Sequence, residues 1–443
     1  MTDALPDRGG TIFAPASSFG RAAVAVVRIS GPAAGAVLDL LAGGRPEPRR
    51  LSLRRLRDPD TRAILDQALV AWLPGPATAT GEDMAELHLH GGLAVRAAVL
   101  RALASVPGCR PAEAGGFSRR AFLNGRIDLT EAEGIADLID AETEAQRVQA
   151  LRQLDGALGR QVAAWRETGI DLLAGAEAAL DFADEGDVDA DDLDAALSGR
   201  AAALRDAIQI ALADGCRGER LREGFCVVLA GAPNAGKSTL LNALSGRDAA
   251  IVSDIPGTTR DAIEVRCDLG GLPVILVDTA GLRATEDAIE AEGVKRTHHR
   301  IRSADLVLHL VPADAPSVAD GLGDIPTLRV RTKSDLAPRA GEGTLAVSAI
   351  TGAGLDALLD AVQAAAAASI SQGDALVTRE RHRAALTRAA GHLDRVATAP
   401  AGFPPELIAE DLRLAVRALG EVGGHVGVEE MLDRLFSGFC IGK

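Results

Sequence analysis

Residues 231–239 read Gly-Ala-Pro-Asn-Ala-Gly-Lys-Ser-Thr and match the phosphate-binding loop pattern G-x-x-x-x-G-K-[ST]. The apolar run 225–230 before the loop predicts a buried strand, and the run 239–244 after it predicts a helix. In a strand, glycine loop and helix of this kind, backbone N–H groups close around phosphate oxygens. Lys237 would then reach the β- and γ-phosphates, and the Ser238 hydroxyl would bind Mg²⁺. The motif alone therefore predicts a nucleoside triphosphate site.

Three later motifs narrow the expected nucleotide to guanine, and each follows an apolar run that predicts a strand. They are Asp278-Thr279-Ala280-Gly281, Thr332-Lys333-Ser334-Asp335 and Ser348-Ala349-Ile350. The Asp335 carboxylate can accept two hydrogen bonds from the N–H groups of guanine, which adenine does not supply. The ordered motifs predict a GTPase domain, with an ATP-using P-loop enzyme or an accidental loop as the alternatives. Thr332 stands where the motif usually has Asn, so one amide contact to the base is lost.

Composition excludes several other classes of protein. The chain has 443 residues, which predicts two to four domains, and 47% hydrophobic residues, which can fill their cores. A net charge of −15 argues against a nonspecific coat of nucleic acid. The five cysteines include no C-x-x-C pair, so neither a zinc cage nor a disulfide framework is expected. No secretory signal and no apolar run of about 20 residues is seen, so we expect a cytoplasmic protein.

The pattern of strand-like and helix-like runs divides the chain into four stretches. Residues 1–118 mix both kinds of run, 119–220 and 373–443 read as helices, and 221–372 hold the nucleotide motifs. We therefore predict a multidomain fold. It would combine an α+β N-terminal domain, an all-α helical bundle built from the two helical stretches, and an inserted α/β Ras-like P-loop GTPase domain.

Stretches outside the nucleotide motifs carry a resemblance to one family. They are the opening block Thr11-Ile12-Phe13-Ala14-Pro15-Ala16, the block 117–129 (FSRRAFLNGRIDL), the run 136–141 (ADLIDA) and the terminal Phe439-Cys440-Ile441-Gly442-Lys443. With these stretches and the mid-chain GTPase motifs, the whole chain closely resembles the tRNA-modification GTPases of the MnmE (TrmE) family. The terminal Cys-Ile-Gly-Lys is the most specific part, because many GTPases share the P-loop motifs.

The resemblance implies a function and its partners. It implies a GTP-hydrolysing protein that works with the flavoprotein MnmG (GidA), which carries FAD. Together they would add a carboxymethylaminomethyl or aminomethyl group to C5 of the wobble uridine of certain tRNAs. The implied assembly is a homodimer, paired through residues 1–118, that forms a heterotetramer with MnmG.

The same N-terminal domain is implied to bind a folate, either 5,10-methylenetetrahydrofolate or 5-formyltetrahydrofolate. Its contacts map to Arg28, Glu86, Arg126 and Lys443. Arg126 stands where the family usually has Lys, which keeps the charge and changes the geometry.

The resemblance also implies how hydrolysis is catalysed. Many GTPases carry a water-orienting Gln directly after this glycine motif, whereas this chain has Leu282. By family position Glu290 takes that role, while Lys237 acts on the phosphates. Arg260 is the candidate for an arginine finger, but the family uses a potassium ion instead. We therefore expect potassium-dependent hydrolysis when two GTPase domains pair.

Metal and nucleotide contacts follow from the same resemblance. The expected Mg²⁺ ligands are Ser238 and Thr259. The expected potassium ligands are Asn234, Ser253, Ile255 and Thr258. The expected GTP contacts are Asn234, Ala235, Gly236, Lys237, Ser238, Thr239, Ser253, Asp254, Ile255, Pro256, Gly257, Thr258, Thr259, Asp278, Thr279, Ala280, Gly281, Thr332, Lys333, Ser334, Asp335, Ser348, Ala349 and Ile350.

Cys440 and the overall function each leave alternatives open. A lone Cys440 at a helix end fits packing, but its place beside the implied folate site favours a catalytic role, whether as nucleophile, acid or redox group. One other function is a GTPase switch in ribosome assembly, although such proteins usually carry a basic RNA-binding domain. Another is a folate-binding scaffold with a degenerate GTPase, against which the intact Lys237, Ser238, Thr259 and Asp278 argue.

Overall fold

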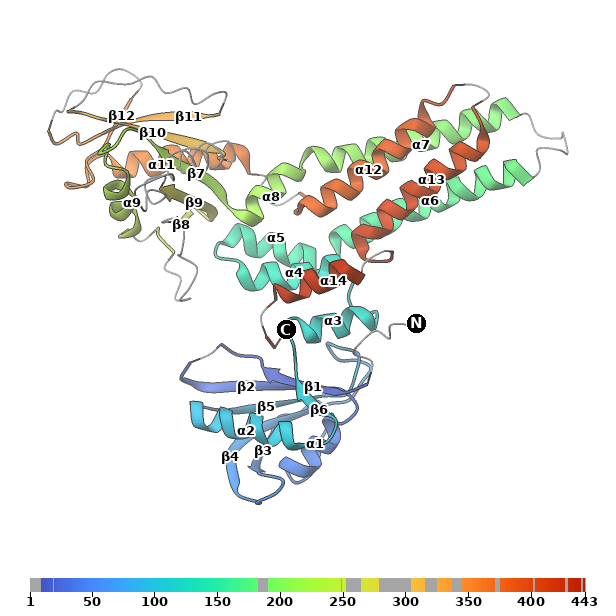
Figure 1. Cartoon of the computed structure of the whole chain (residues 1–443), viewed down its shortest axis with the longest axis vertical. Coiled ribbons are helices and arrows are strands. Elements are labelled where there is room, and N and C mark those ends of the chain that lie inside the picture. Colours follow the sequence, from blue (N-terminus) through green and yellow to red (C-terminus); the bar gives the residue numbers. More distant parts are fainter. Residues whose placement is uncertain are drawn as a thin grey trace, which may run out of the picture. The chain divides into compact units, whose positions relative to one another are not determined.

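The structure is a computed structural model, shown in Figure 1. It describes residues 9–18, 20–181, 190–247, 249–251, 264–278, 304–314, 325–336, 344–370, 375–400, 403–426, 429–439 and 441–442. Contacts divide the chain into two compact units. The first is Met1–Ala132 together with Gly423–Lys443, and the second is Glu133–Val422.

A six-stranded sheet forms the centre of the first unit. Its strands are β1 (Thr11–Pro15), β2 (Ala22–Ser30), β3 (Ser52–Arg57), β4 (Ile64–Leu73), β5 (Met84–Gly91) and β6 (Cys109–Pro111), in the order β3-β4-β5-β2-β1-β6. All neighbours are antiparallel except β1 and β6. Side chains alternate between the two faces, so Val27 and Ile29 are fully buried while Arg28 points to the other face.

Two helices cover the buried face of this sheet. They are α1 (Ala34–Leu41) and α2 (Leu93–Ser105). Val37 and Leu38 of α1 and Val99 and Leu103 of α2 join the strand residues in one core. The spacing of Val99 and Leu103 places both on one side of α2, as expected for a helix packed on a sheet.

The end of the chain returns to the same unit. Here α3 (Gly116–Leu123) contacts α14 (Glu429–Ser437). Beyond α14, Ile441 forms an antiparallel bridge with Ala114. Gly442 has φ +100°, and a Cβ on it would lie 2.0 Å from the Pro15 carbonyl oxygen. Only glycine fits there, so Gly442 packs against the end of β1.

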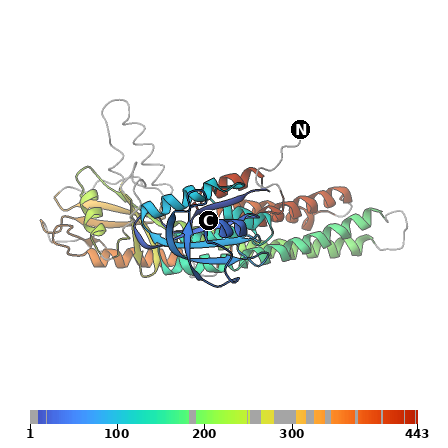
Figure 2. The same ribbon diagram turned by 90° about the horizontal axis from the view of Figure 1, so that it is seen from below.

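The second unit begins within α4 (Leu129–Asp140) and contains a group of long helices. They are α5 (Glu144–Leu154), α6 (Ala157–Asp181), α7 (Ala190–Ala213), α8 (Gly215–Glu223), α12 (Glu380–Ala397) and α13 (Pro405–Gly423). Helix α12 packs along α7, and α6 along α7 (Figures 1 and 2). The buried positions of α12, including Leu386, Leu393 and Val396, recur at helical spacing and join one core with residues of α6 and α7.

A second six-stranded sheet lies between α8 and α12 in the chain. Its strands are β7 (Phe225–Ala230), β8 (Glu264–Leu269), β9 (Leu272–Asp278), β10 (Leu306–Pro312), β11 (Thr327–Thr332) and β12 (Leu345–Ala346), in the order β12-β11-β10-β7-β9-β8. Only β8 is antiparallel to its neighbour. Central β7 is apolar nearly throughout because both faces are covered.

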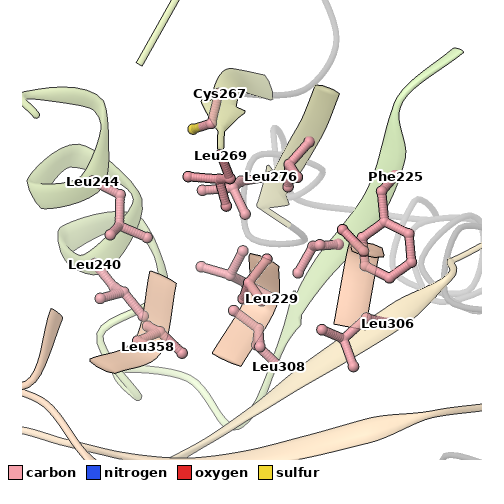
Figure 3. Packing of buried hydrophobic residues seen from close by; sticks show 14 of the residues in the cluster. Phe225, Leu229, Leu240, Leu244, Cys267, Leu269, Leu276, Leu306, Leu308 and Leu358 are labelled. Carbon is pink, nitrogen blue, oxygen red and sulfur yellow. The ribbon is translucent and has the colours of Figure 1, made fainter. Parts of the chain in front are cut away.

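Helices α9 (Lys237–Ser245) and α11 (Leu355–Ser369) complete this core. Figure 3 shows Leu240 and Leu244 of α9 directed toward Leu229 of β7 and Leu358 of α11. Because α9 is anchored through these leucines, the loop before it is fixed between a buried strand and a buried helix.

These observations confirm the predicted multidomain fold class. An α+β unit, a set of packed helices and a mainly parallel sheet with a P-loop are all present. The four predicted domain ranges stay a prediction, and the contacts group Gly423–Lys443 with the first unit rather than with 373–422. No helix in the described part of the chain is long and apolar enough to cross a membrane.

Candidate nucleotide-binding site

The phosphate-binding loop connects the end of β7 to the start of α9. Gly231 has φ +151°, and a Cβ on it would lie 2.5 Å from the Leu310 carbonyl oxygen. Asn234 and Gly236 also have positive φ, +63° and +87°. These backbone conformations turn the chain sharply between strand and helix, and loops of this kind can bind an anion through their backbone N–H groups.

Lys237 and Ser238 occupy the first positions of α9. The Lys237 Nζ donates to the carbonyl oxygens of Gly231 and Ala232 at 2.8 and 3.0 Å, so its ammonium group crosses the loop. The Ser238 Oγ donates to Asp278 Oδ2 at 2.5 Å. Asp278 is fully buried at the end of β9. The first and second sequence motifs therefore meet, and they place a cation and a hydroxyl–carboxylate oxygen pair beside the loop.

The third and fourth motifs also meet. Asp335 Oδ1 accepts a hydrogen bond from Ser348 Oγ at 2.7 Å, and the Ser334 N–H donates to the Val347 carbonyl at 3.1 Å. The Asp335 side chain is exposed, with its orientation set by Ser348. This arrangement suits a carboxylate that binds two N–H donors of a planar base.

Thr332 has a role that the motif did not reveal. It is 4% exposed, and its Oγ1 donates to the Ala235 carbonyl in the phosphate-binding loop at 2.6 Å. The neighbouring Lys333 has φ +57°, and its Nζ pairs with Asp314 Oδ2 at 2.9 Å. Thr332 thus joins the base-side motif to the phosphate-side loop, although it lacks the amide of the usual Asn.

Several predicted site residues lie outside the described residues. They are Ser253, Asp254, Ile255, Pro256, Gly257, Thr258, Thr259, Thr279, Ala280, Gly281, Glu290, Cys440 and Lys443, together with Arg260 and Leu282. The catalytic and potassium-binding roles assigned to members of this group therefore stay predictions.

The proposed folate residues are partly brought together in the first unit. Arg28 on β2 faces Glu86 on β5 in the strand register, and its Nε and Nη2 donate to Glu86 Oε1, both at 3.2 Å. The Arg28 guanidinium also lies 5.8 Å from the centre of the Phe117 ring. Arg126 lies beside Gly81, where a Cβ would be 3.1 Å from the Arg126 Cγ. Phe117 belongs to the block 117–129 that resembles the family, but nothing in the sequence indicated that its ring contacts Arg28.

The strand, loop and helix, with Ser238 bonded to Asp278, define a P-loop nucleotide-binding protein. Family models narrow the class further: "MnmE helical domain" matches residues 129–440, and "GTP-binding protein TrmE N-terminus" matches residues 11–126.

Curated relatives agree with the family models along the whole chain. The tRNA modification GTPase MnmE of Methylorubrum populi is 87% identical over 444 residues, with 100% of both chains covered. The protein of the same name from Methylobacterium radiotolerans is 70% identical, covering 98% of this chain and 99% of the relative. That of Rhodospirillum rubrum is 55% identical, with the same coverage. The chain therefore belongs to the MnmE family of tRNA modification GTPases, which confirms the resemblance read from its sequence.

Proposed function

We propose that this chain binds and hydrolyses GTP and that hydrolysis serves the modification of tRNA. The observation that carries the proposal is that the four nucleotide motifs contact one another in pairs, and that Thr332 of the third motif binds the phosphate-binding loop of the first. Lys237 crosses the phosphate-binding loop, Ser238 is bonded to Asp278, and Asp335 is oriented by Ser348. Family membership supports the same activity.

The oxygen pair beside the loop fits Mg²⁺. Ser238 Oγ and Asp278 Oδ2 lie 2.5 Å apart, and Mg²⁺ prefers hard oxygen ligands together with phosphate oxygens. We propose that Ser238 and Thr259 hold the ion while Asp278 orients the Ser238 hydroxyl. When bound, Mg²⁺ neutralises charge on the phosphates. The chain itself supplies the Lys237 ammonium group and the backbone N–H groups of the loop.

The catalytic step in the proposal does not use a Gln. We propose that the Glu290 carboxylate orients the attacking water, since Leu282 cannot.

Potassium would be held by the Asn234 side-chain oxygen, with Ser253, Ile255 and Thr258, when two GTPase domains pair. An amide oxygen and carbonyl oxygens suit a hard monovalent cation, and the positive φ of Asn234 places this residue at the bend of the loop. Potassium would supply the positive charge that an arginine finger supplies in other GTPases, and this charge stabilises the negative charge on the phosphates.

The tRNA chemistry in the proposal involves the first unit and a partner. The chain would act in the cytoplasm as a homodimer, in a heterotetramer with the FAD-carrying MnmG, and would modify C5 of the wobble uridine. Arg28 and Glu86, 3.2 Å apart, provide a cation and an acceptor that fit a folate's carboxylates and pterin N–H groups. Arg126, Lys443 and Cys440 complete the proposed site. The position of Gly442 supports this site, because Gly442 packs against Pro15 of β1, and β1 pairs with β2, the strand that carries Arg28.

Hydrolysis by the purified chain tests the proposal. Wild-type protein should hydrolyse GTP in preference to ATP. Lys237→Ala should lower the rate roughly 100-fold or more, because one preorganised charge on the phosphates is lost. Arg217→Ala removes an exposed arginine of α8 and serves as the control, with no expected change. A Lys237→Ala rate equal to that of wild type would contradict the GTPase assignment.

A further inference from the structure

Two short connectors attach the nucleotide-binding sheet to the helices of the second unit. The incoming connector, residues 222–224, ends α8 and leads into β7 and the phosphate-binding loop. The outgoing connector, residues 375–379, leads into α12. The outgoing connector packs closely on α8: a Cβ on Gly218 would lie 2.3 Å from the Val377 carbonyl oxygen. The chain passes between the sheet and the flanking helices α8 and α12 at these two segments, and a shift of the sheet bears on both of them.

Arg222 links the two connectors to each other and to two further helices. Its Nε donates to the Thr378 carbonyl oxygen at 3.0 Å. Its Nη1 lies 4.0 Å from Asp137 Oδ1 on α4. Its own carbonyl oxygen accepts a hydrogen bond from Gln146 Nε2 on α5 at 3.0 Å. One residue at the end of α8 therefore contacts the outgoing connector, α4 and α5.

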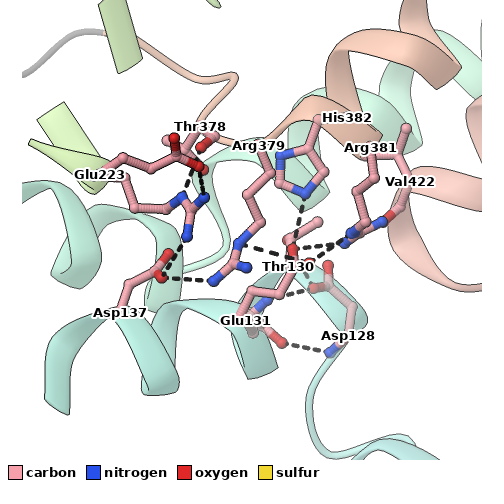
Figure 4. A network of polar contacts seen from close by, with 12 residues as sticks. Asp128, Thr130, Glu131, Asp137, Glu223, Thr378, Arg379, Arg381, His382 and Val422 are labelled. Carbon is pink, nitrogen blue, oxygen red and sulfur yellow. Dashed lines mark hydrogen bonds and ion pairs between the residues drawn. The ribbon is translucent and has the colours of Figure 1, made fainter. Parts of the chain in front are cut away.

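Asp137 holds the outgoing connector as well. Arg379, which precedes α12, donates from Nη2 to Asp137 Oδ1 at 2.5 Å, as Figure 4 shows. Burial raises the pKa of Asp137 to about 6, against the opposing effect of the Arg379 and Arg222 charges. At neutral pH the carboxyl group is therefore still ionised, and it pairs with one arginine from each connector.

A second carboxylate of α4, Glu133, binds the start of α12. Glu133 on α4 is 0% exposed and accepts from Arg381 Nε at 2.5 Å, Arg381 Nη2 at 2.6 Å and His382 Nε2 at 2.8 Å. Burial alone would raise the pKa of Glu133, but His382 and Arg381 hold it well below its usual range. Arg381 also donates to the Val422 carbonyl oxygen at 3.0 Å (Figure 4). Such a buried charge tolerates little displacement of its partners.

We propose that Arg222 is the positioning residue of a junction that transmits nucleotide-dependent movement of the sheet to the helices. The junction consists of Arg222 and the groups around it: Glu133, Asp137, Arg379, Arg381 and His382. Along the chain, Glu223, Gly224 and β7 separate Arg222 from the phosphate-binding loop. The buried Glu133 carboxylate holds the start of α12 through Arg381 and His382. Because Arg222 binds both connectors, a shift of β7 is passed to α4 and α12 together. This proposal rests on the proposed GTP function, because the movement that the junction transmits would be caused by binding and hydrolysis of GTP.

Hydrogen exchange of the full-length chain without nucleotide tests the junction itself. In Arg222→Ala, amides of residues 375–383 should exchange roughly tenfold faster than in wild type, because the connectors lose a charge-assisted hydrogen bond. Arg217→Ala is the matched control, since Arg217 lies on the same helix and, among the described residues, pairs with Asp214 at 3.6 Å. Equal exchange in Arg222→Ala and Arg217→Ala would overturn the proposal.

Addition of GDP with Mg²⁺ then tests transmission. In wild type and Arg217→Ala, GDP should alter exchange both in β7–α9 and at the start of α12. In Arg222→Ala, the change should remain in β7–α9 and disappear from α12, and Arg222→Lys should restore part of it. A merely structural role would instead lower protection everywhere and leave the nucleotide response of α12 intact, which would overturn the proposal.

A second variant keeps the test decisive if Arg222→Ala does not fold. Asp137→Asn preserves shape and removes the charge that both connectors share, so it should also uncouple α12 from GDP. If GDP leaves β7–α9 of the wild-type chain unchanged, the proposed nucleotide function fails. In that case, the exchange rates of residues 375–383 without nucleotide, compared between wild type and Arg222→Ala, still show whether Arg222 holds the two connectors together.

Discussion

Thr332 lies at the end of β11, where its hydroxyl group donates to the Ala235 carbonyl oxygen at 2.6 Å in a buried part of the site. The motif position alone indicated a lost contact to the base. The structure adds a compensating role, because a hydroxyl at this position ties the base-side strand to the phosphate-binding loop. A threonine can therefore serve here through the loop rather than through the nucleotide.

Replacement of this hydroxyl tests that role. Thr332→Val keeps the shape and leaves the buried Ala235 carbonyl without its donor, so we expect a loss of about 1–2 kcal/mol in stability together with weaker GDP binding. Thermal unfolding with and without GDP measures both effects. Thr327→Val, an exposed site on the same strand, should change stability by less than about 0.5 kcal/mol. Equal behaviour of the two variants would show that the Thr332 bond has no energetic role.

At the scale of elements, helix α8 is shaped by what packs against it. It contains Gly215 and Gly218, which are unfavourable in a helix by intrinsic propensity. Both face the outgoing connector: a Cβ on Gly215 would lie 3.2 Å from Val377, and one on Gly218 only 2.3 Å from the Val377 carbonyl oxygen. Close approach of the two segments, rather than a break in the helix, explains these glycines.

Two glycine-to-alanine changes should therefore act in opposite directions. Gly218→Ala should destabilise the chain by about 1–3 kcal/mol, because the new methyl group forces α8 and the outgoing connector apart. Gly199→Ala on α7 has nothing within 4 Å of its Cβ position and should stabilise by about 0.5–1 kcal/mol through helix propensity. Thermal unfolding of both variants checks the prediction. A stabilising Gly218→Ala would mean that α8 and the connector are not packed as described.

For the whole molecule, Asp137 links stability to pH. The pKa of this carboxyl group is raised by burial from 3.8 to about 6 in the folded chain, so the folded state binds its proton more tightly than the unfolded state. Its contribution to stability is therefore fully present below about pH 4 and is lost as pH rises through about 6. The change corresponds to roughly 3 kcal/mol.

Comparison with Asp137→Asn isolates this effect, since other groups titrate in both proteins. The stability of wild type relative to the variant should fall between pH 4 and pH 7 and then become constant. Unfolding midpoints measured across that range provide the test. A difference that does not vary with pH would show that Asp137 keeps an ordinary pKa in the folded chain.

Potassium dependence is also a property of the whole molecule, because the proposal requires two GTPase domains to pair. We expect hydrolysis to be at least about tenfold faster in potassium chloride than in sodium chloride at equal ionic strength, as one stabilising charge in the transition state is worth at least that much. Asn234→Ala should flatten the difference while GDP still binds. Equal wild-type rates in the two salts would remove the cation from the mechanism.

The sequence by itself determined the fold class, the nucleotide motifs and the family. Those features depend on residues that are close together in the sequence, such as the glycine spacing from 231 to 236, the apolar strand runs and the helix start at Lys237. Only the tertiary structure decided which distant groups meet. Glu133 and His382 are 249 residues apart in sequence, and Thr332 is 97 residues from Ala235. No periodicity signals such pairs, because they form only when packed helices and strands bring buried polar groups within hydrogen-bond distance.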